Sequence, residues 1–270
     1  MENNLIEKLS ALAKSRFQDS DQSLDLENRV ANNETLKILC LTEEFQNARQ
    51  IFLSENNLDD SAIEVLCEHL KGEKLESLYL NNNKITDRGV ELLSQSALSK
   101  NLTCLMLEAN KIGPVGAKFI AESASFHNLE TLFLDNNPIT AEGVESVANS
   151  KQLARLKNLH LDSTGMGDKG VLAIANSPAM ERLEKLYLCS NHIGDEGAIA
   201  LCSSPYIKNL KALSVWRNEI RDEGGKAIAE SQNFGKLERL YMSLNLIDRP
   251  VRKIIRQSEL SARLKTLVMD

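Results

Sequence analysis

The chain carries a repeat of 27 residues that runs without insertion from Ala48 to its end. The string Leu-Glu-Ser-Leu-Tyr-Leu-Asn-Asn-Asn-Lys-Ile opens at Leu75, and related strings open at Ala48, Leu102, Leu129, Leu156, Leu183, Leu210, Leu237 and Leu264. A period of about 20 to 29 residues with the pattern LxxLxLxxNxL is typical of stacked supersecondary units. The repeat therefore predicts a solenoid and not a single globular core.

Each unit is predicted to hold one short strand and one helix. Leu78 and Leu80 alternate with other residues, as in a strand with one buried face, and Val90 and Leu93 follow at helical spacing. Neighbouring strands lie about 4.8 Å apart whereas packed helices need about 8 to 10 Å, so stacked units must bend. The predicted fold class is α/β: a right-handed strand–helix superhelix shaped as a horseshoe, with a parallel sheet on the concave face and helices on the convex face.

We expect two parts in the chain: a helical cap over residues 1–45 and a repeat domain over residues 46–270 with eight repeats and a ninth terminal strand. Solenoids need caps because their terminal units leave an apolar face uncovered. Leu5, Leu9 and Leu12 predict an amphipathic helix at the front. The apolar stretch around Leu36 and Leu39 is interpreted as a second cap helix and not as another repeat.

The chain stops at Asp270, inside the ninth predicted strand. An unpaired strand edge is a template for pairing with other strands. Three explanations stay open: a frayed edge, an edge-to-edge dimer, or a sequence that belongs to a longer protein. We expect a monomer, with a dimer through this C-terminal edge strand as the alternative.

Other residue types recur at the same period, and each has a structural interpretation. Asparagines in the turn after each strand are expected to satisfy buried backbone groups, and Thr164 interrupts them, which predicts a local weakness. Aspartates in the first turn of each helix are expected to favour the helix dipole. Glycines beside them are expected to allow close approach to the strand layer. Thr86, Thr140, Asp59 and Asp248 are predicted helix caps.

Composition narrows the classes of partner and compartment. The net charge of −6 argues against binding a nucleic-acid backbone, which needs a basic stripe. Five cysteines without a CxxC pair indicate reduced thiols, and the acidic first residues do not resemble a general secretory signal. No apolar run reaches the length of a membrane span. We expect a cytoplasmic protein with no nucleic-acid partner, no membrane insertion, no cofactor and no metal.

Side chains that alternate with the leucines point into the predicted concave face. Two columns of them are rich in aromatic and charged residues, which are enriched at the energetic centres of protein interfaces. The alternative is that solvated strands simply favour aromatic residues. We predict that the face binds a protein partner through Phe52, Tyr79, Glu108, Phe133, Asp135, His160, Asp162, Tyr187, Cys189, Trp216, Arg217 and Tyr241.

Charge along this face is predicted to be uneven. Glu108, Asp135 and Asp162 hold the same position in consecutive units, which predicts carboxylates about 5 Å apart that repel one another. A lysine or arginine of a basic partner is the preferred explanation, with screening by water or a metal ion as alternatives. The far end is positive through Lys185, Arg217 and Arg239.

One trio on the same face has the residue types of a thiol nucleophile with a base and an orienting acid. It consists of Cys189, His160 and Asp162. No oxyanion hole or closed pocket is predicted beside it. Catalysis is therefore the least favoured function.

The string from Leu75 to Gly89, Leu-Glu-Ser-Leu-Tyr-Leu-Asn-Asn-Asn-Lys-Ile-Thr-Asp-Arg-Gly, and its copies over residues 46–270 resemble the ribonuclease-inhibitor-like subfamily of leucine-rich repeats. This resemblance implies the horseshoe solenoid. The Asn-, Lys-, Glu- and Ser-rich style also resembles leucine-rich-repeat effectors of intracellular bacterial pathogens, which implies a host protein as target and delivery by a specialised secretion system. The Ran GTPase-activating proteins share the repeat as well.

The expected function is a non-catalytic protein–protein interaction module that binds its partner on the concave face. Fold alone does not fix function, so two alternatives from other classes stay open. One is a regulator of a small GTPase, similar to GTPase-activating proteins. The other is an enzyme that uses Cys189.

Overall fold

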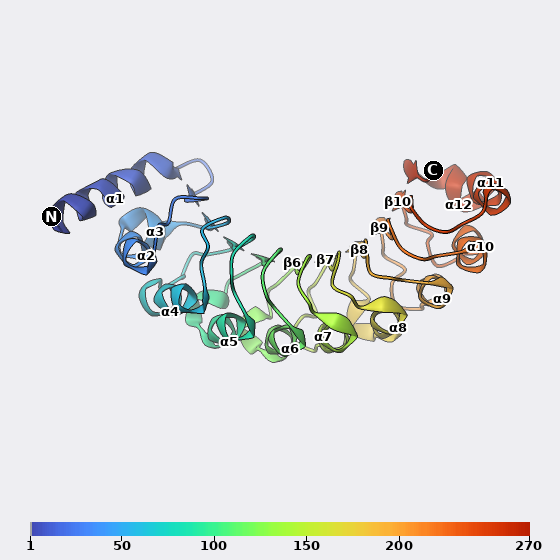
Figure 1. The fold of residues 1–270 in the computed structure, drawn as a ribbon, viewed down its shortest axis with the longest axis horizontal. Helices are drawn as coiled ribbons and strands as arrows, with labels where there is room; N and C mark the ends of the chain where they lie inside the picture. Colours follow the sequence, from blue (N-terminus) through green and yellow to red (C-terminus); the bar gives the residue numbers. More distant parts are fainter. Residues whose placement is uncertain (1) are drawn as a thin grey trace.

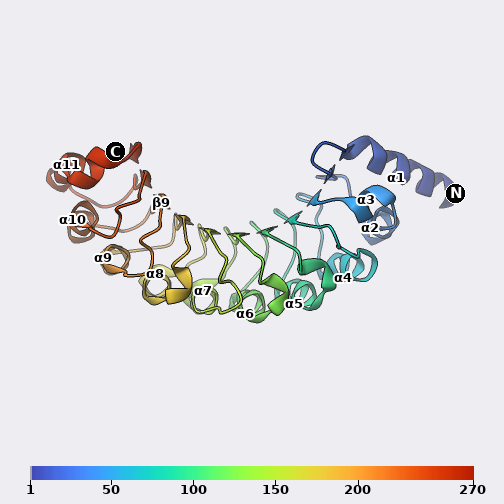
Figure 2. The ribbon, with the colours of Figure 1, turned by 180° about the vertical axis from the view of Figure 1, so that it is seen from behind.

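The computed structural model describes residues 2–270. The chain forms an open arc, with the strands lining the hollow side and the helices on the outside (Figure 1). The two ends of the chain lie at opposite tips of the arc, and the view from behind shows the same two layers (Figure 2).

The strands are short, and they follow one another in the sheet in the order of the sequence. They are β1 (Phe17–Gln18), β2 (Ser23–Asp25), β3 (Gln50–Phe52), β4 (Ser77–Tyr79), β5 (Cys104–Met106), β6 (Thr131–Phe133), β7 (Asn158–His160), β8 (Lys185–Tyr187), β9 (Ala212–Ser214), β10 (Arg239–Tyr241) and β11 (Thr266–Val268).

The helices follow the strands along the outside of the arc. They are α1 (Glu2–Arg16), α2 (Asn33–Cys40), α3 (Glu43–Asn47), α4 (Asp60–His69), α5 (Asp87–Gln95), α6 (Pro114–Glu122), α7 (Thr140–Ala148), α8 (Gly167–Asn176), α9 (Asp195–Ser203), α10 (Asp222–Glu230), α11 (Arg249–Gln257) and α12 (Glu259–Arg263), with 3-10 turns η1 (Ala97–Ser99), η2 (Ala124–Phe126) and η3 (Pro178–Met180). None of the helices in the described residues has the length and apolar character needed to cross a lipid bilayer.

Strands β2 to β11 are parallel, and each residue pairs with the residue 27 positions further on, as Leu78 does with Leu105. The middle residue of these strands faces the core: from Ile51 and Leu78 to Leu213 and Leu240 it is buried in every strand from β3 to β10. The first and third residues therefore face the hollow of the arc. The predicted α/β solenoid, with a parallel sheet inside and helices outside, is confirmed.

The strand–helix pattern begins one unit earlier than expected. β2 pairs in parallel with β3, with Leu24 beside Ile51, and α2 begins 27 residues before α4. The apolar stretch around Leu36 and Leu39, which we interpreted as a cap helix and not as a repeat, is thus the helix of a further unit. Arg29 stands at the position of the repeat asparagine, which hides this unit in the sequence. The backbone N–H groups of Arg29 and Val30 instead donate to Asn56 Oδ1, both at 2.7 Å.

The turn asparagines join neighbouring units. Asn83 Oδ1 accepts the backbone N–H groups of Asn56 and Leu58 in the preceding unit, and its Nδ2 donates to the carbonyls of Leu53 and Leu80. One buried amide therefore satisfies backbone groups of two units, which confirms the structural role predicted for this column.

The turn that precedes Thr164 departs from this pattern. Ile139 N–H donates to the carbonyl of Asn137 at 2.8 Å, whereas the equivalent Ile112 N–H donates to an asparagine side chain. Thr140 has a φ of +60° and makes no capping hydrogen bond, so its predicted capping role is wrong. Asp248 also precedes its helix without a side-chain cap, whereas Asp59 and Thr86 do cap theirs.

The first-turn aspartates act on the following helix and not only on their own. Asp60 Oδ1 accepts the backbone N–H groups of Thr86 and Gly89, at 2.8 and 3.0 Å. A Cβ at Gly89 would lie 2.5 Å from the same oxygen. Gly116, Gly197 and Gly224 lie against an aspartate of the preceding helix in the same way, whereas a Cβ at Gly143 or Gly170 would meet the apolar side chain of Ile139 or Met166. At four of the six positions the glycine therefore leaves room for the aspartate, a contact that the expected approach to the strand layer did not include.

Candidate partner-binding surface

A ladder of five ring side chains and one methionine follows the hollow face of the sheet. It consists of the third strand residues Phe52, Tyr79, Met106, Phe133, His160 and Tyr187, which we call the ring ladder. Ring centroids lie 4.1 Å apart between Phe52 and Tyr79, 3.6 Å between Phe133 and His160, and 4.1 Å between His160 and Tyr187, with the planes within 17° of parallel. The ladder thus presents two stacks of rings to the hollow, Phe52 with Tyr79 and Phe133 with His160 and Tyr187, and Met106 lies between them.

The rings are half-buried, because each one covers the flank of the next. Stacked rings contribute about 0.5 to 1.5 kcal/mol per pair beyond the area that they bury. The rings lie opposite the buried leucines and not beneath the sheet. The rings therefore support the inner face by stacking while their edges remain available.

The three predicted acids lie on neighbouring strands, but two of them have partners within the chain. The backbone N–H of Asp162 donates to Asp135 Oδ1, and the backbone N–H of Cys189 donates to Asp162 Oδ1, both at 2.6 Å. Asp135 is only 5% exposed. These two carboxyl groups therefore tie consecutive units together, and their proximity does not by itself require a basic partner.

Burial decides the protonation of the residues beside the ring ladder. Loss of hydration raises the pKa of Asp135 to about 7, with the charges of Asp162 and Glu108 adding to the rise, and burial also raises the pKa of Asp162. Burial, helped by the charge of Lys185, lowers the pKa of His160 to about 4. His160 Nδ1 lies 3.9 Å from Asp135 Oδ2, so between about pH 4 and 7 this is a contact of two neutral groups.

Cys189 is placed for packing and hydrogen bonding. Its Sγ lies 3.0 Å from Ser214 Oγ, and burial raises the pKa of its thiol to about 11. A thiol must ionise to act as a nucleophile, so this environment opposes the proposed chemistry. Within residues 2–270 there is also no cluster of three or more His, Cys, Asp or Glu side chains that would hold a metal ion.

Beyond Tyr187 the surface changes in character. Trp216 is 37% exposed, and Arg217 beside it is exposed on the turn that follows β9. Leu244, one unit beyond Arg217, is 52% exposed, and its φ of +56° is the left-handed turn conformation that recurs at this position of the repeat, as at Asn82 and Arg217. Exposed apolar side chains that gather on one surface often mark an interaction site. We call Trp216, Arg217 and Leu244 the aromatic rim.

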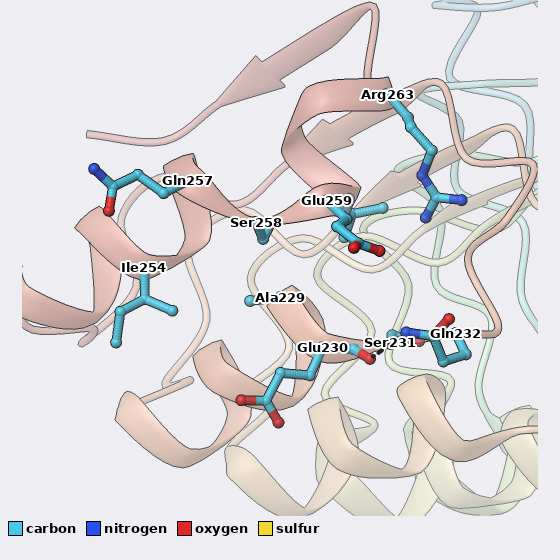
Figure 3. A pocket seen from close by; sticks show the side chains of 10 residues that line it. Ala229, Glu230, Ser231, Gln232, Ile254, Gln257, Ser258, Glu259 and Arg263 are labelled. Carbon is cyan, nitrogen blue, oxygen red and sulfur yellow. Dashed lines mark hydrogen bonds between the residues drawn. The ribbon is translucent and has the colours of Figure 1, made fainter.

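Two open grooves lie away from the ring ladder. One, of about 540 Å³, lies between the ends of α10, α11 and α12, and Figure 3 shows Glu230, Glu259 and Arg263 around it. The other, of about 460 Å³, adjoins the aromatic rim and is lined by Arg217, His192 and Glu219, with His192 Nδ1 2.7 Å from Glu219 Oε1. The first groove has a mixed lining that includes Ala229, Ile254 and Leu260, and the second is lined by polar residues; neither contains the predicted catalytic trio.

The repeat also matches a known family. A family model described as Leucine Rich repeat matches residues 73–94, 98–121, 127–148, 155–175, 182–202 and 206–229. The chain is a leucine-rich-repeat protein. Comparison with curated proteins gave no match. Leucine-rich repeats generally mediate protein–protein interaction through their extended concave surfaces.

The predicted site residues of this leucine-rich-repeat protein occupy one face, but they do not form one continuous site. The ring ladder contains five of them, Phe52, Tyr79, Phe133, His160 and Tyr187. Tyr241 is separated from the ladder by Ser214 on β9. That interruption, and Ala212 on the same strand, were not predicted to be part of the site. The signal was available: β9 is the strand that places two small residues where its neighbours carry long ones.

Proposed function

We propose that this protein is a non-catalytic binding module and that a protein partner lies along its concave face. The observation that carries the proposal is the ring ladder with the aromatic rim at its end. Ring edges and a tryptophan are available to a partner on a rigid sheet, and aromatic residues with arginine supply much of the binding energy at protein interfaces. Because the sheet is preorganised, a partner loses little free energy in ordering it.

We further propose that the partner places a basic group near Glu108 and Asp162. Glu108 lies just after β5 and is half-exposed, and its Oε1 lies 3.4 Å from Asn136 Nδ2. Asp162 keeps one carboxyl oxygen beyond the one that accepts from Cys189 N–H. Opposite charge at these positions would fix the orientation of a bound segment more than it would add affinity.

The finer assignments are proposals as well. We assign the protein to the ribonuclease-inhibitor-like subfamily and to the effector class, acting in a reducing compartment on a host protein; its five cysteines are free. Capture from a eukaryotic lysate, set beside capture from a bacterial lysate, tests the effector assignment. Stronger capture from the bacterial lysate would contradict it.

We also propose that residues 1–45 act as a cap, in which α1 covers the additional unit formed by β2 and α2, and that the protein is monomeric. Leu9 and Ala13 of α1 are buried against the first units. If the protein instead forms a dimer, two copies would pair along the edge strand β11. Sedimentation that shows a dimer at moderate concentration would contradict the monomer.

The central test is the double substitution Tyr187→Ala with Trp216→Ala. We expect partner binding to weaken by about 2 kcal/mol or more, because both rings are removed from one end of the face. The urea midpoint should fall slightly, because Tyr187 stacks on His160. Titration calorimetry with the captured partner and urea unfolding measure the two effects.

The matched control is Val115→Ala with Ile199→Ala, which removes exposed apolar side chains from the helices α6 and α9. This control should leave partner affinity unchanged. If the Tyr187 and Trp216 substitutions unfold the protein, the two rings belong to the scaffold and not to a binding surface. If binding survives them in a folded protein, the concave face is not the binding surface.

A further inference from the structure

The ring ladder is interrupted at β9, where two small residues lie between two pairs of long ones. Ala212 pairs with Lys185 on one side and Arg239 on the other. Ser214 likewise pairs with Tyr187 and Tyr241. We call this arrangement the β9 gap. Its floor is a methyl and a hydroxymethyl group, and its two walls each carry one cation and one phenol.

The spacing of the sheet sets the width of the β9 gap. Adjacent strands lie about 4.8 Å apart, so the bases of Lys185 and Arg239 are separated by about 10 Å with only Ala212 between them. Ala212 and Ser214 are nevertheless buried although they face the hollow, which means that the longer side chains lean over them. The cationic and phenolic side chains therefore border the β9 gap on both sides.

The charges of the β9 gap are not neutralised within the described chain. Lys185 and Arg239 form no ion pair in residues 2–270. The nearby acids Glu184 and Glu238 are paired instead with Lys211 and Lys265, at 2.8 and 3.0 Å. Two cations on neighbouring walls repel each other, so an anion between them would relieve that repulsion.

One atom in particular lacks a partner. Across residues 2–270, Arg239 Nε is the single buried side-chain nitrogen or oxygen atom without a hydrogen bond. Buried polar groups are almost always hydrogen-bonded, and the exceptions often mark an absent ion or ligand. A guanidinium group presents its N–H donors as a planar fork that matches the two oxygens of a carboxylate.

We propose that the β9 gap binds an acidic side chain, aspartate or glutamate, of the protein partner. The inference rests on the proposed function, because it assigns one recognition element of the same face. Arg239 pairs with the carboxylate, Lys185 supplies the second charge, and the Tyr187 and Tyr241 hydroxyls border it. Glu108 follows β5 and Asp162 follows β7, so they lie several strands away from the β9 gap. The partner segment therefore carries a basic residue near β5 to β7 and an acidic residue near β9.

The test is an NMR titration of the full-length, ¹⁵N-labelled protein with the peptide acetyl-Glu-Glu-Glu-amide. We expect saturable shifts centred on the amides of Ala212, Ser214 and Tyr241, and none with acetyl-Gln-Gln-Gln-amide. Arg239→Gln and Lys185→Gln should each weaken binding at least fivefold. Ala212→Asp, which supplies an acid from within the chain, should abolish the shifts.

The control Lys236→Gln removes an equal charge from the exposed loop before β10, where Lys236 Nζ donates to Asn209 Oδ1. It should leave the peptide affinity within twofold. Inorganic phosphate and N-acetylphosphotyrosine amide are titrated in two further NMR experiments. Binding of these two without the glutamate peptide would overturn the carboxylate assignment. Shifts spread over the whole surface, or shifts that survive Arg239→Gln, would overturn the site itself.

The outcomes separate this inference from the proposed function. If the glutamate peptide does not bind while the Tyr187 and Trp216 substitutions still weaken partner binding, only the assignment of the β9 gap as a carboxylate site is wrong. If those substitutions leave partner binding intact, the concave face is wrong as a whole, whatever the peptide does.

Discussion

Asn191→Ala is expected to lower the free energy of unfolding by about 4 kcal/mol, a large effect for one substitution. Asn191 is fully buried. Its Oδ1 accepts from the backbone N–H groups of Thr164 and Gly165 and from Thr164 Oγ1, and its Nδ2 donates to the carbonyls of Leu161 and Cys189. Alanine leaves these groups unsatisfied, at about 1 to 3 kcal/mol for each one that water cannot reach.

Urea unfolding measures the loss, and hydrogen exchange locates it. Because a solenoid is stabilised by contacts between neighbouring units, we expect the loss of protection to concentrate between β7 and β8. Asn209→Ala is the control, since Asn209 is a half-buried asparagine at the surface whose side chain donates one hydrogen bond to the Glu181 carbonyl and accepts one from Lys236. Equal losses at Asn191 and Asn209 would show that the buried amide has no special role.

Asp135→Asn is expected to stabilise the protein at pH 8 by about 2 to 4 kcal/mol and to have little effect at pH 4. The upper value follows from the pKa of about 7 in the folded protein against about 3.9 in the unfolded chain, at about 1.4 kcal/mol per pKa unit. Asparagine keeps the oxygen that accepts from Asp162 N–H but carries no charge to bury.

The direction of the pH dependence follows from which state holds the proton. Between about pH 4 and 7 the folded protein keeps the Asp135 proton while the unfolded chain loses it, so this group lowers stability as the pH rises. His160 acts in the opposite sense: its pKa is lowered to about 4, so its contribution to stability rises with pH between about 4 and 6.5. The two contributions to stability offset each other in the native protein. In the Asp135→Asn variant the free energy of unfolding should therefore rise with pH between about 4 and 6.5, because only the contribution of His160 remains.

Urea midpoints at several pH values between 4 and 8 test this expectation. Asp19→Asn is the control because it removes the same charge from an exposed turn. A constant difference between the Asp135→Asn variant and the native protein at all pH values would mean that Asp135 does not titrate in this range.

The fold was largely predictable because the leucines, the turn asparagines and the helix glycines all recur every 27 residues. The leucine columns define the strands, and Asn83 and its equivalents define the turns. The first unit is not evident from the sequence because Arg29 stands there in place of the asparagine that marks the other units. The pairs Leu24 with Ile51, Leu39 with Leu66 and Cys40 with Cys67, each 27 residues apart, carried the signal.

The surface was predictable only in outline. Alternation along the strands identifies which side chains face the hollow, but it does not say how far each is covered by its neighbours. Asp135 was expected to face a partner and is instead buried with a backbone hydrogen bond. Asp60 was expected to act on its own helix and instead accepts from the next one. Both outcomes depend on distances between units, which the pattern within one unit does not contain.

Hydrogen exchange of the protein with and without its captured partner tests the central claim most directly. The account predicts that protection on binding lies in the peptides that cover β4 to β10 and the turn with Trp216 and Arg217, and that the outer helices α5 to α10 are unchanged. Protection confined to the outer helices, or to the groove between α10 and α12, would contradict it.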